Sequence, residues 1–277
     1  MMLQSKLLKL VSMVGISVLS MGMLVGCGGG TSTTPQTTEQ VATDTQSEGT
    51  VQTTPSDNVI IMGTHAEFEP FEYREGLDVV GFDVEIAKAV AAKLGKELQI
   101  EDIAFDSLIM GLNNDKIDFI AAGMTATEKR AKQVDFSNSY FKSKQVIIVK
   151  EDDTSVASAD DLVGKTVGVQ LGTTGDLFVS STEGIKVVQV KKGTQAVMDL
   201  LQGKVDAVVI DQEPAKKMVE GQDGLKILDV PFIEEEYAIA VKKGNTELLN
   251  AINETIDELQ ASGEYDKIYE KFFGKTE

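Results

Sequence analysis

Cysteine and histidine are almost missing from this chain, since each occurs once in 277 residues. The lone cysteine, Cys27, excludes an internal disulfide and a metal site built from several cysteines. General acid–base chemistry requires a positioned proton donor or acceptor, and no paired catalytic constellation accompanies the single histidine, His65. We therefore expect a protein without a metal ion, a cofactor or a catalytic step.

Basic residues are also scarce, because 26 lysines and arginines stand against 44 aspartates and glutamates, for a formal net charge of -18. Such a surface repels the phosphates of nucleic acids and anionic lipid headgroups. The composition therefore excludes nucleic acid as a partner and indicates a soluble folded part.

Long apolar runs are missing except near the first residue, where Lys6 and Lys9 precede the apolar stretch 10–25. This stretch is too short for a comfortable membrane span and ends in small residues, as in a secretion signal. The tetrad Leu24-Val25-Gly26-Cys27 resembles a bacterial lipobox. That resemblance implies a signal peptide with a lipobox over residues 1–27 and a lipid such as palmitate on Cys27. A plain cleaved signal or an uncleaved anchor is the alternative.

Bulky apolar residues are nearly missing from residues 28–57, a segment rich in Gly, Ser, Thr, Gln, Glu and Pro. Such a segment cannot bury enough surface to offset the entropy of ordering, so we expect a disordered tether. A flexible coil of about thirty residues would hold the folded part tens of ångströms from a membrane at most.

Apolar runs alternate with helical patterns along the remaining chain, which indicates α/β architecture with parallel strands. Asp83 is expected to cap a helix that ends at Gly95. The first expected strands cover residues 59–62, 98–103 and 117–122, with a short helix at 106–113. Later strands are expected at 145–150, 166–170, 186–190 and 205–210, followed by a helix capped by Asn245 or Thr246 and stopped by Gly263.

A weak internal repeat relates residues 110–120 to residues 198–208, with Met, Leu, Lys and Asp at matching places. The offset is too long for a solenoid, so two similar lobes fit better. In that register Gly123 corresponds to Asp211, and both stand just beyond the end of a buried strand. Ligands of open α/β sheets bind beyond the carboxyl ends of strands, so facing lobes would present both residues to one cleft. A chance likeness of helix-turn-strand units is the alternative.

Residues 121–136 follow the third expected strand and combine groups suited to a small carboxylate. Gly123 lets a ligand approach the backbone closely, and Thr125 offers a hydroxyl. The guanidinium of Arg130 can grip a carboxylate with two parallel hydrogen bonds. An exposed arginine on a helix is the alternative for Arg130.

The second half offers a complementary set of groups. The turn at 172–175 precedes an expected helix, and free backbone amides there favour an anion near Thr173 and Thr174. Asp211 ends an apolar strand, where an acidic side chain can meet an ammonium group. A free amino acid carries both charges, and neither is desolvated without several kcal/mol of compensation. A tight loop with capping threonines and a helix-capping Asp211 are the alternatives.

Three further segments flank residues 121–136 in a fixed order: 63–73 (GTHAEFEPFEY), 81–86 (GFDVEI) and 135–141 (DFSNSYF). Together they resemble the polar amino acid-binding proteins of ABC importers, extracytoplasmic solute-binding proteins of family 3, over roughly residues 58–274. The resemblance implies an α/β, two-lobed periplasmic-binding-protein-like fold of type II with two hinge-crossing strands. It places lobe 1 at 58–139 and 239–277, lobe 2 at 145–233, and the hinge at 140–144 and 234–238.

The resemblance also implies roles for single residues. Arg130 and the Thr173 region would hold the ligand carboxylate, and Asp211 would hold its ammonium group. Phe68 and Phe105 would sandwich the ligand side chain. The expected ligand-binding residues are His65, Phe68, Phe105, Gly123, Thr125, Arg130, Gln170, Thr173, Thr174 and Asp211.

Two of these positions indicate the kind of ligand. His65 stands where many members of the family carry an aspartate, so the pocket loses a negative charge that would suit arginine or lysine. Gln170 matches a position that often contacts the ligand side chain, and its amide can donate or accept. We therefore expect a neutral polar amino acid, such as glutamine or cystine, in preference to a basic one.

The expected function is capture of a free amino acid by hinge closure and its delivery to an ABC permease with its ATPase. The protein would be a monomer, held by its lipid at the extracytoplasmic face of the cell membrane. Two alternatives remain: a dehydratase on the same fold, which would consume the bound compound, and a sensor that reports amino acid levels to a partner.

Overall fold

The computed structural model describes residues 58–228, 230 and 232–275. The expected signal peptide, the lipidated Cys27 and the tether lie outside these residues. Within the described ranges, no helix combines the length and the apolar character needed to cross a membrane.

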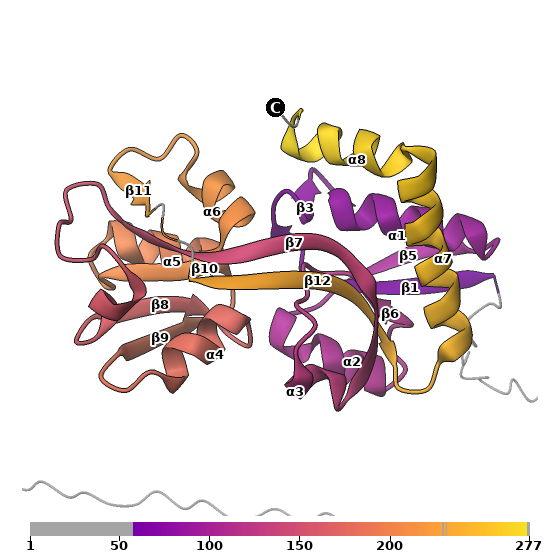
Figure 1. The fold of residues 1–277 in the computed structure, drawn as a ribbon, viewed down its shortest axis with the longest axis horizontal. Helices are drawn as coiled ribbons and strands as arrows, with labels where there is room; N and C mark the ends of the chain where they lie inside the picture. The colour runs from indigo at the N-terminus through magenta and orange to yellow at the C-terminus, as the bar shows by residue number, and fades with distance from the viewer. Residues whose placement is uncertain (1–57, 229, 231, 276–277) are drawn as a thin grey trace, which may run out of the picture. The chain divides into compact units, whose positions relative to one another are not determined.

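Two α/β lobes are joined by two long antiparallel strands (Figure 1). β7 covers Val134–Lys150 and β12 covers Ile233–Lys242, and they pair from Val134 with Lys242 to Gln145 with Ile233. The predicted two-lobed α/β fold with two crossing strands is therefore confirmed. The expected hinge segments 140–144 and 234–238 lie within β7 and β12, and the exact lobe limits stay a prediction.

The main sheet runs through both lobes in the order β5-β1-β6-β12-β7-β10-β8-β9, with β11 paired to β7. In lobe 1 the strands are β1 (Val59–Thr64), β5 (Glu97–Asp102) and β6 (Phe119–Ile120). In lobe 2 they are β8 (Thr166–Gln170), β9 (Lys186–Val190), β10 (Ala207–Asp211) and β11 (Leu225–Ile227). A small antiparallel sheet comprises β2 (Glu67–Phe68), β3 (Glu72–Glu75) and β4 (Asp78–Val80).

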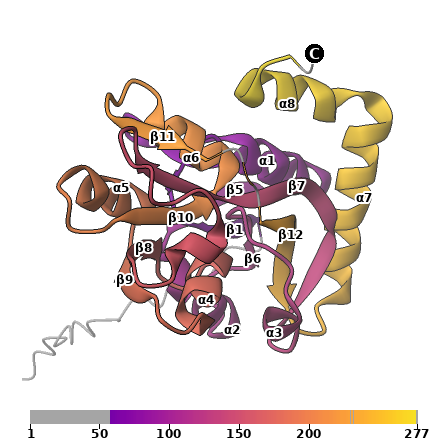
Figure 2. The same ribbon diagram turned by 60° about the vertical axis from the view of Figure 1, so that its left-hand side comes forward.

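Helices cover both faces of this sheet. The first half holds α1 (Phe82–Lys93), the 3-10 turn η1 (Phe105–Ser107), α2 (Leu108–Asn113) and α3 (Glu128–Ala131). Lobe 2 holds η2 (Ala159–Leu162), α4 (Thr174–Ser181), α5 (Gly193–Leu201) and α6 (Gln212–Val219). The chain then returns as α7 (Thr246–Ser262) and α8 (Glu264–Phe273), which lie along the outer side of lobe 1 (Figure 2).

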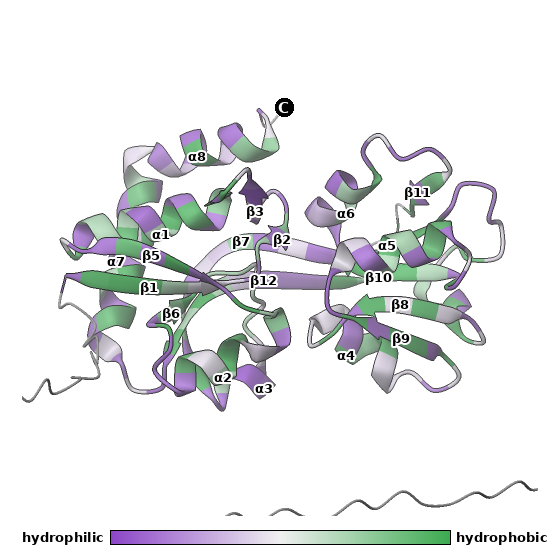
Figure 3. Ribbon diagram, turned by 180° about the vertical axis from the view of Figure 1, so that it is seen from behind, coloured by the Kyte–Doolittle hydropathy of each residue, from purple (hydrophilic) through white to green (hydrophobic). Residues whose placement is uncertain are grey.

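Strand alternation explains why the sheet is covered on both faces. In β10, Val208 and Ile210 pack on the side of α5, whereas Ala207 and Val209 pack on the side of α4. Side chains of a strand alternate between faces, so a continuous apolar run requires helices on both. The central strands β1, β8 and β10 are accordingly hydrophobic, while the helices are mixed (Figure 3).

The helix α7 has the cap and the stop residue that the sequence predicts, and α8 follows it directly. The side chain of Asn245 caps α7 by accepting a hydrogen bond from the Leu248 amide, and Gly263 ends the helix with a φ of 77°. In α8, Tyr265 packs edge-on against Phe82 at 5.5 Å between ring centroids, and Phe273 stacks on Phe141 at 5.0 Å. Tyr265 and Phe273 are thus half-buried side chains that pack against the core residues Phe82 and Phe141.

Asp83 does not cap α1, so this expectation is wrong. The capping residue is Gly81, whose φ of 139° and close approach to the Phe71 carbonyl exclude a side chain. Asp83 is instead fully buried, where its Oδ2 accepts hydrogen bonds from the Gly123 amide at 2.8 Å and from the Tyr140 hydroxyl at 2.7 Å. The residue thus fixes the backbone next to the predicted site.

Candidate functional site

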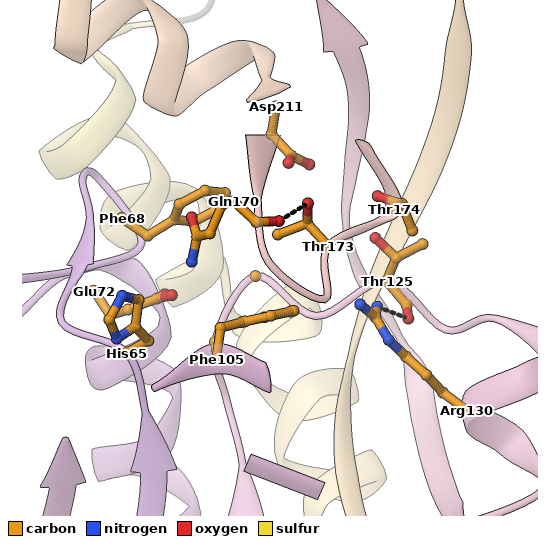
Figure 4. A pocket seen from close by; sticks show the side chains of 12 residues that line it. His65, Phe68, Glu72, Phe105, Thr125, Arg130, Gln170, Thr173, Thr174 and Asp211 are labelled. Carbon is orange, nitrogen blue, oxygen red and sulfur yellow. Dashed lines mark hydrogen bonds between the residues drawn. The ribbon is translucent and has the colours of Figure 1, made fainter. Parts of the chain in front are cut away.

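A pocket lies between the lobes, at the carboxyl ends of β1, β6, β8 and β10 (Figure 4). All ten residues proposed from the sequence line it, which brings groups from both lobes to one place. Its lining consists of His65, Phe68, Glu72, Phe105, Ala122, Gly123, Thr125, Arg130, Gln170, Thr173, Thr174 and Asp211. Glu72 and Ala122 were not foreseen.

Arg130 enters the pocket from the short helix α3 and is 7% exposed. Its Nη1 donates to the Thr125 carbonyl at 2.7 Å, and its Nη2 donates to the Gly172 carbonyl in lobe 2 at 3.0 Å. The guanidinium also lies 5.3 Å from the centroid of the Phe105 ring. Burial lowers the pKa of Arg130, but its ordinary pKa is so high that the charge persists. Its partners are therefore neutral carbonyls, and its positive charge remains available for an anion.

Thr125 lies beside Arg130 but uses its hydroxyl differently from the expectation. Its Oγ1 donates to Glu235 Oε2 at 3.0 Å. The hydroxyl proton is thus engaged by a carboxylate behind the pocket, while the oxygen keeps acceptor capacity. Thr125 also forms an isolated bridge with Tyr237 of β12, which ties this wall to a strand that joins the lobes.

Thr173 and Thr174 mark the start of α4 on the opposite wall. The Thr173 hydroxyl donates to the Gln170 carbonyl at 2.8 Å and accepts from the Asp176 amide at 3.2 Å, as a helix cap does. Thr174 Oγ1 accepts from Gln145 Nε2 at 3.3 Å. The start of the eight-residue α4, whose first backbone amides have no partner within the helix, therefore belongs to this wall of the pocket.

Asp211 ends β10 and is 4% exposed. Its Oδ1 accepts a hydrogen bond from the Tyr237 hydroxyl at 2.5 Å and a longer one from Ser143 Oγ at 3.5 Å. Burial, followed by the proximity of Glu235, raises the pKa of Asp211 well above its ordinary value. A cation in the pocket would reverse this effect by favouring the charged carboxylate.

Gly123 forms the floor beneath the aromatic ring of Phe68. Its φ is 51°, and a Cβ at this position would lie 2.8 Å from Phe68 Cε1. Its amide donates to Asp83, so this N–H is not free for a ligand. Glycine is required here because a larger residue would push Phe68 into the pocket.

His65 and Glu72 form the end of the pocket remote from Arg130 (Figure 4). Burial lowers the pKa of His65, which therefore carries no charge near pH 7. Glu72 is 1% exposed, and neither of its carboxyl oxygens has a hydrogen-bond donor within the described residues. Burial and the neighbouring Asp83 raise the pKa of Glu72 well above its ordinary value.

Two acidic residues of this region escaped the sequence reasoning. Glu72 belongs to the segment 63–73, but no sequence pattern indicated its burial. Its strand β3 has only four residues, which is too short to show a clear alternation of buried and exposed positions. Glu235 sits in the acidic run 234–236, which looks like a solvated surface. Its neighbours in the run are exposed and Glu235 is 5% exposed, because alternate residues of β12 point inward together with Tyr237. Strand alternation could therefore have identified Glu235.

The charges are arranged for a compound with two ionic groups. Arg130 supplies the positive charge on one side, while Asp211 and Glu72 supply carboxyl groups elsewhere in the same pocket. In the part of the chain with described coordinates, no group of three or more His, Cys, Asp or Glu side chains could hold a metal ion. The pocket can thus retain a small zwitterion through hydrogen bonds and ion pairs.

Comparison with known families gives one match over most of the chain. Residues 60–275 match the family described as bacterial extracellular solute-binding proteins, family 3. This range contains all the residues that line the pocket.

Individual proteins and solved structures are similar over the same region. The arginine-binding extracellular protein ArtP of Bacillus subtilis (strain 168) is 38% identical over 220 residues, covering 77% of this chain and 86% of ArtP. A mutant of ArgBP from T. maritima is 46% identical with a TM-score of 0.76, covering 79% of this chain and 96% of that one. An ancestral arginine-binding protein bound to glutamine is 44% identical with a TM-score of 0.76, covering 79% and 99%.

Proposed function

Because the chain belongs to family 3 of the bacterial extracellular solute-binding proteins, we propose that its solute is a free L-amino acid, arginine before others, destined for an ABC permease. The observation that carries the proposal is the placement of Arg130 and Asp211, from different lobes, around one buried pocket. The family consists of binding proteins rather than enzymes, so retention and release are the whole task.

The pocket suggests one orientation for the amino acid. Its carboxylate would meet Arg130 and the first amides of α4, and its ammonium group would meet Asp211. The side chain would pass between Phe68 and Phe105 toward His65, Gln170 and Glu72. This orientation is supported by the charges of the lining residues and by their order along the pocket (Figure 4).

Closure of the lobes would couple capture to delivery. Arg130 contacts the Gly172 carbonyl across the cleft, and Lys192 of lobe 2 donates to Glu67 of lobe 1 at 2.5 Å. Contacts that form only in the closed arrangement let a ligand shift the equilibrium toward it. The closed form would be the one that docks on a permease with its ATPase.

The end of the pocket that would hold the ligand side chain favours a cation more than the sequence suggested. His65 and Gln170 point to a neutral polar ligand such as glutamine or cystine. Glu72 adds a buried carboxyl without a donor, and a guanidinium would supply parallel N–H groups to it. The names of ArtP and ArgBP agree with arginine. Glutamine is the second candidate, supported by the ancestral arginine-binding protein that was solved with it.

Replacing Glu72 by glutamine is expected to weaken arginine binding about tenfold or more and to change glutamine binding much less. The reason is that a lost charge-assisted hydrogen bond costs about 1.5 to 3 kcal/mol, and each 1.4 kcal/mol is tenfold in affinity. Isothermal titration calorimetry with both amino acids measures the difference. The exposed Glu75→Gln on the same strand is the matched control. If the affinities for arginine and glutamine fall equally, Glu72 does not recognise the ligand side chain.

The proposed function itself is tested by identifying what the protein binds. Mass spectrometry of small molecules released from the denatured purified protein should detect an amino acid. In a thermal-shift screen of the twenty common amino acids plus cystine, a ligand at 100 times its Kd should add about 2.7 kcal/mol to the stability. If no amino acid raises the unfolding midpoint, the proposal fails.

The membrane attachment is a separate proposal that rests on the tetrad Leu24-Val25-Gly26-Cys27. A lipid on Cys27 would keep the protein, as a monomer, at the extracytoplasmic face of the cell membrane. Incorporation of labelled palmitate by the cell-expressed protein, and its loss in Cys27→Ala, tests the attachment.

A further inference from the structure

A buried acid, Glu235, lies behind the pocket wall near the start of β12, beside the pocket residue Asp211. Glu235 Oε2 accepts from Thr125 Oγ1 at 3.0 Å and from Gln145 Nε2 at 3.2 Å, while its Oε1 has no partner among the described residues. Asp211 flanks the same face of β7, because Asp211 pairs with Gln145 and Glu235 pairs with Ser143, two residues away. Ser143 Oγ also donates to Asp211 Oδ1 at 3.5 Å. Both side chains are at most 5% exposed.

Within the described part of the chain, no lysine or arginine forms a salt bridge with Asp211 or Glu235. Arg130 is near enough to act on both acids, but it gives its hydrogen bonds to the carbonyls of Thr125 and Gly172. The other ionisable groups that face them are the uncharged Tyr237 on β12 and a further acid, Glu72 on β3. A negative charge on Asp211 is costly here, because the carboxyl is removed from water and lies near a second acid.

We propose that Glu235 is a positioning residue that favours the protonated form of Asp211 in the closed arrangement of the lobes, so that the ammonium group of the ligand must displace this proton to solvent. The inference rests on the proposed function, because Asp211 must be the group that receives the ammonium. An ammonium group has three donors and needs an acceptor, which a protonated Asp211 supplies poorly. The ligand and the proton therefore compete for the same carboxylate.

The competition fixes the direction of the pH dependence. Burial and Glu235 raise the pKa of Asp211, so Asp211 carries its proton below that raised value. The affinity for an amino acid then falls as the pH falls through this range, by up to about tenfold per pH unit, and is constant above it. Removing the charge of Glu235 lowers the pKa of Asp211 and extends the constant range to lower pH.

The decisive comparison is between the intact protein and Glu235→Gln. The glutamine carbonyl can still accept from Thr125 and Gln145, so the shape is preserved while the charge is lost. Calorimetric titrations with L-arginine and L-glutamine from pH 5 to 8.5, each in two buffers of different ionisation enthalpy, give the affinity and the protons released. Glu236→Gln, an exposed neighbour on β12, is the matched control.

The expected result is that the intact protein and the control release up to one proton per ligand at the ammonium end. Glu235→Gln should release fewer protons and hold its affinity at lower pH, and Glu235→Asp should restore the original profile. Arginine binding can also release a proton from Glu72. This release is the same in the intact protein and in every variant, so it cancels when the proton release of a variant is subtracted from that of the intact protein.

Three outcomes would overturn the inference and leave the amino acid site intact. The first is ligand binding by the intact protein without proton release in the acid range. The second is an unchanged profile in Glu235→Gln. The third is an equal loss of affinity in Glu235→Gln at every pH, which indicates a purely structural role. Failure of the intact protein to bind any amino acid would instead refute the proposed function.

Discussion

Arg130→Ala should weaken amino acid binding by between about 30-fold and a few thousandfold. Truncating one partner of a buried hydrogen-bonded charge pair costs about 2 to 5 kcal/mol, and each 1.4 kcal/mol is tenfold. The guanidinium is 7% exposed and already held by the carbonyls of Thr125 and Gly172, so little ordering entropy is lost when a carboxylate arrives. Calorimetry with L-arginine measures the loss.

Analogues of the ligand make this prediction specific. Agmatine, which is arginine without its carboxyl group, should bind the intact protein and Arg130→Ala with similar affinity. Arg130→Lys should be intermediate, because lysine keeps the charge but lacks the planar fork. The exposed Lys129→Ala on the same helix controls for the general loss of a positive charge. If Arg130→Ala binds arginine as the intact protein does, Arg130 is not in the site.

The second large effect is expected for Asp211→Asn. The amide keeps the size of the side chain and an oxygen for the Tyr237 hydroxyl, but it presents no negative charge to an ammonium group. We expect a loss of arginine affinity of about 2 kcal/mol or more, at least 20-fold. Arginine lacking its α-amino group should bind both forms alike.

The fold itself must be checked in this variant, because Asp211 lies at the contact between the lobes. Asparagine removes a carboxyl whose pKa is raised by burial, so the free energy of unfolding without ligand should not fall, and thermal unfolding measures it. Asp223→Asn, an exposed position in lobe 2, is the matched control. Retained arginine affinity in a folded Asp211→Asn would assign the ammonium to another acid.

Strands could be predicted well from the sequence where an apolar run is clearly bounded by turn residues. The strands at 166–170 and 186–190 have the same limits in the structure, because runs rich in valine are flanked by turn residues. The third strand was predicted over 117–122 but is only Phe119–Ile120. Ile117 and Ala122 are buried without belonging to the strand, since burial requires packing rather than ladder pairing.

Buried acids were harder to predict than strands. Asp83 stands where a capping residue is common, and only the position of Gly123, forty residues later, reveals its role as an acceptor. Glu72 and Glu235 are inward-facing members of short or acidic strands, whose burial depends on segments far away in the chain. Alternation along β12 indicates that Glu235 faces inward, but no local pattern identifies its partners Thr125 and Gln145. Six of the ten pocket residues were proposed from residue chemistry at strand and helix ends as well as from family resemblance: Gly123, Thr125, Arg130, Thr173, Thr174 and Asp211. The other four rest on the resemblance alone, and the contacts of all ten with a ligand stay a prediction.

Lobe 2 is inserted between β7 and β12, and this order matters while the chain emerges from the ribosome. β12 completes lobe 1 by pairing with both β6 and β7, and it is made only after β8, β9 and β10. Until then, the nascent lobe 1 has two open strand edges, which invite pairing with other chains. Lobe 2 can form its own parallel strands earlier. A chain with this order of strands therefore gains from keeping the edges of β6 and β7 unpaired until residue 242 has been synthesised.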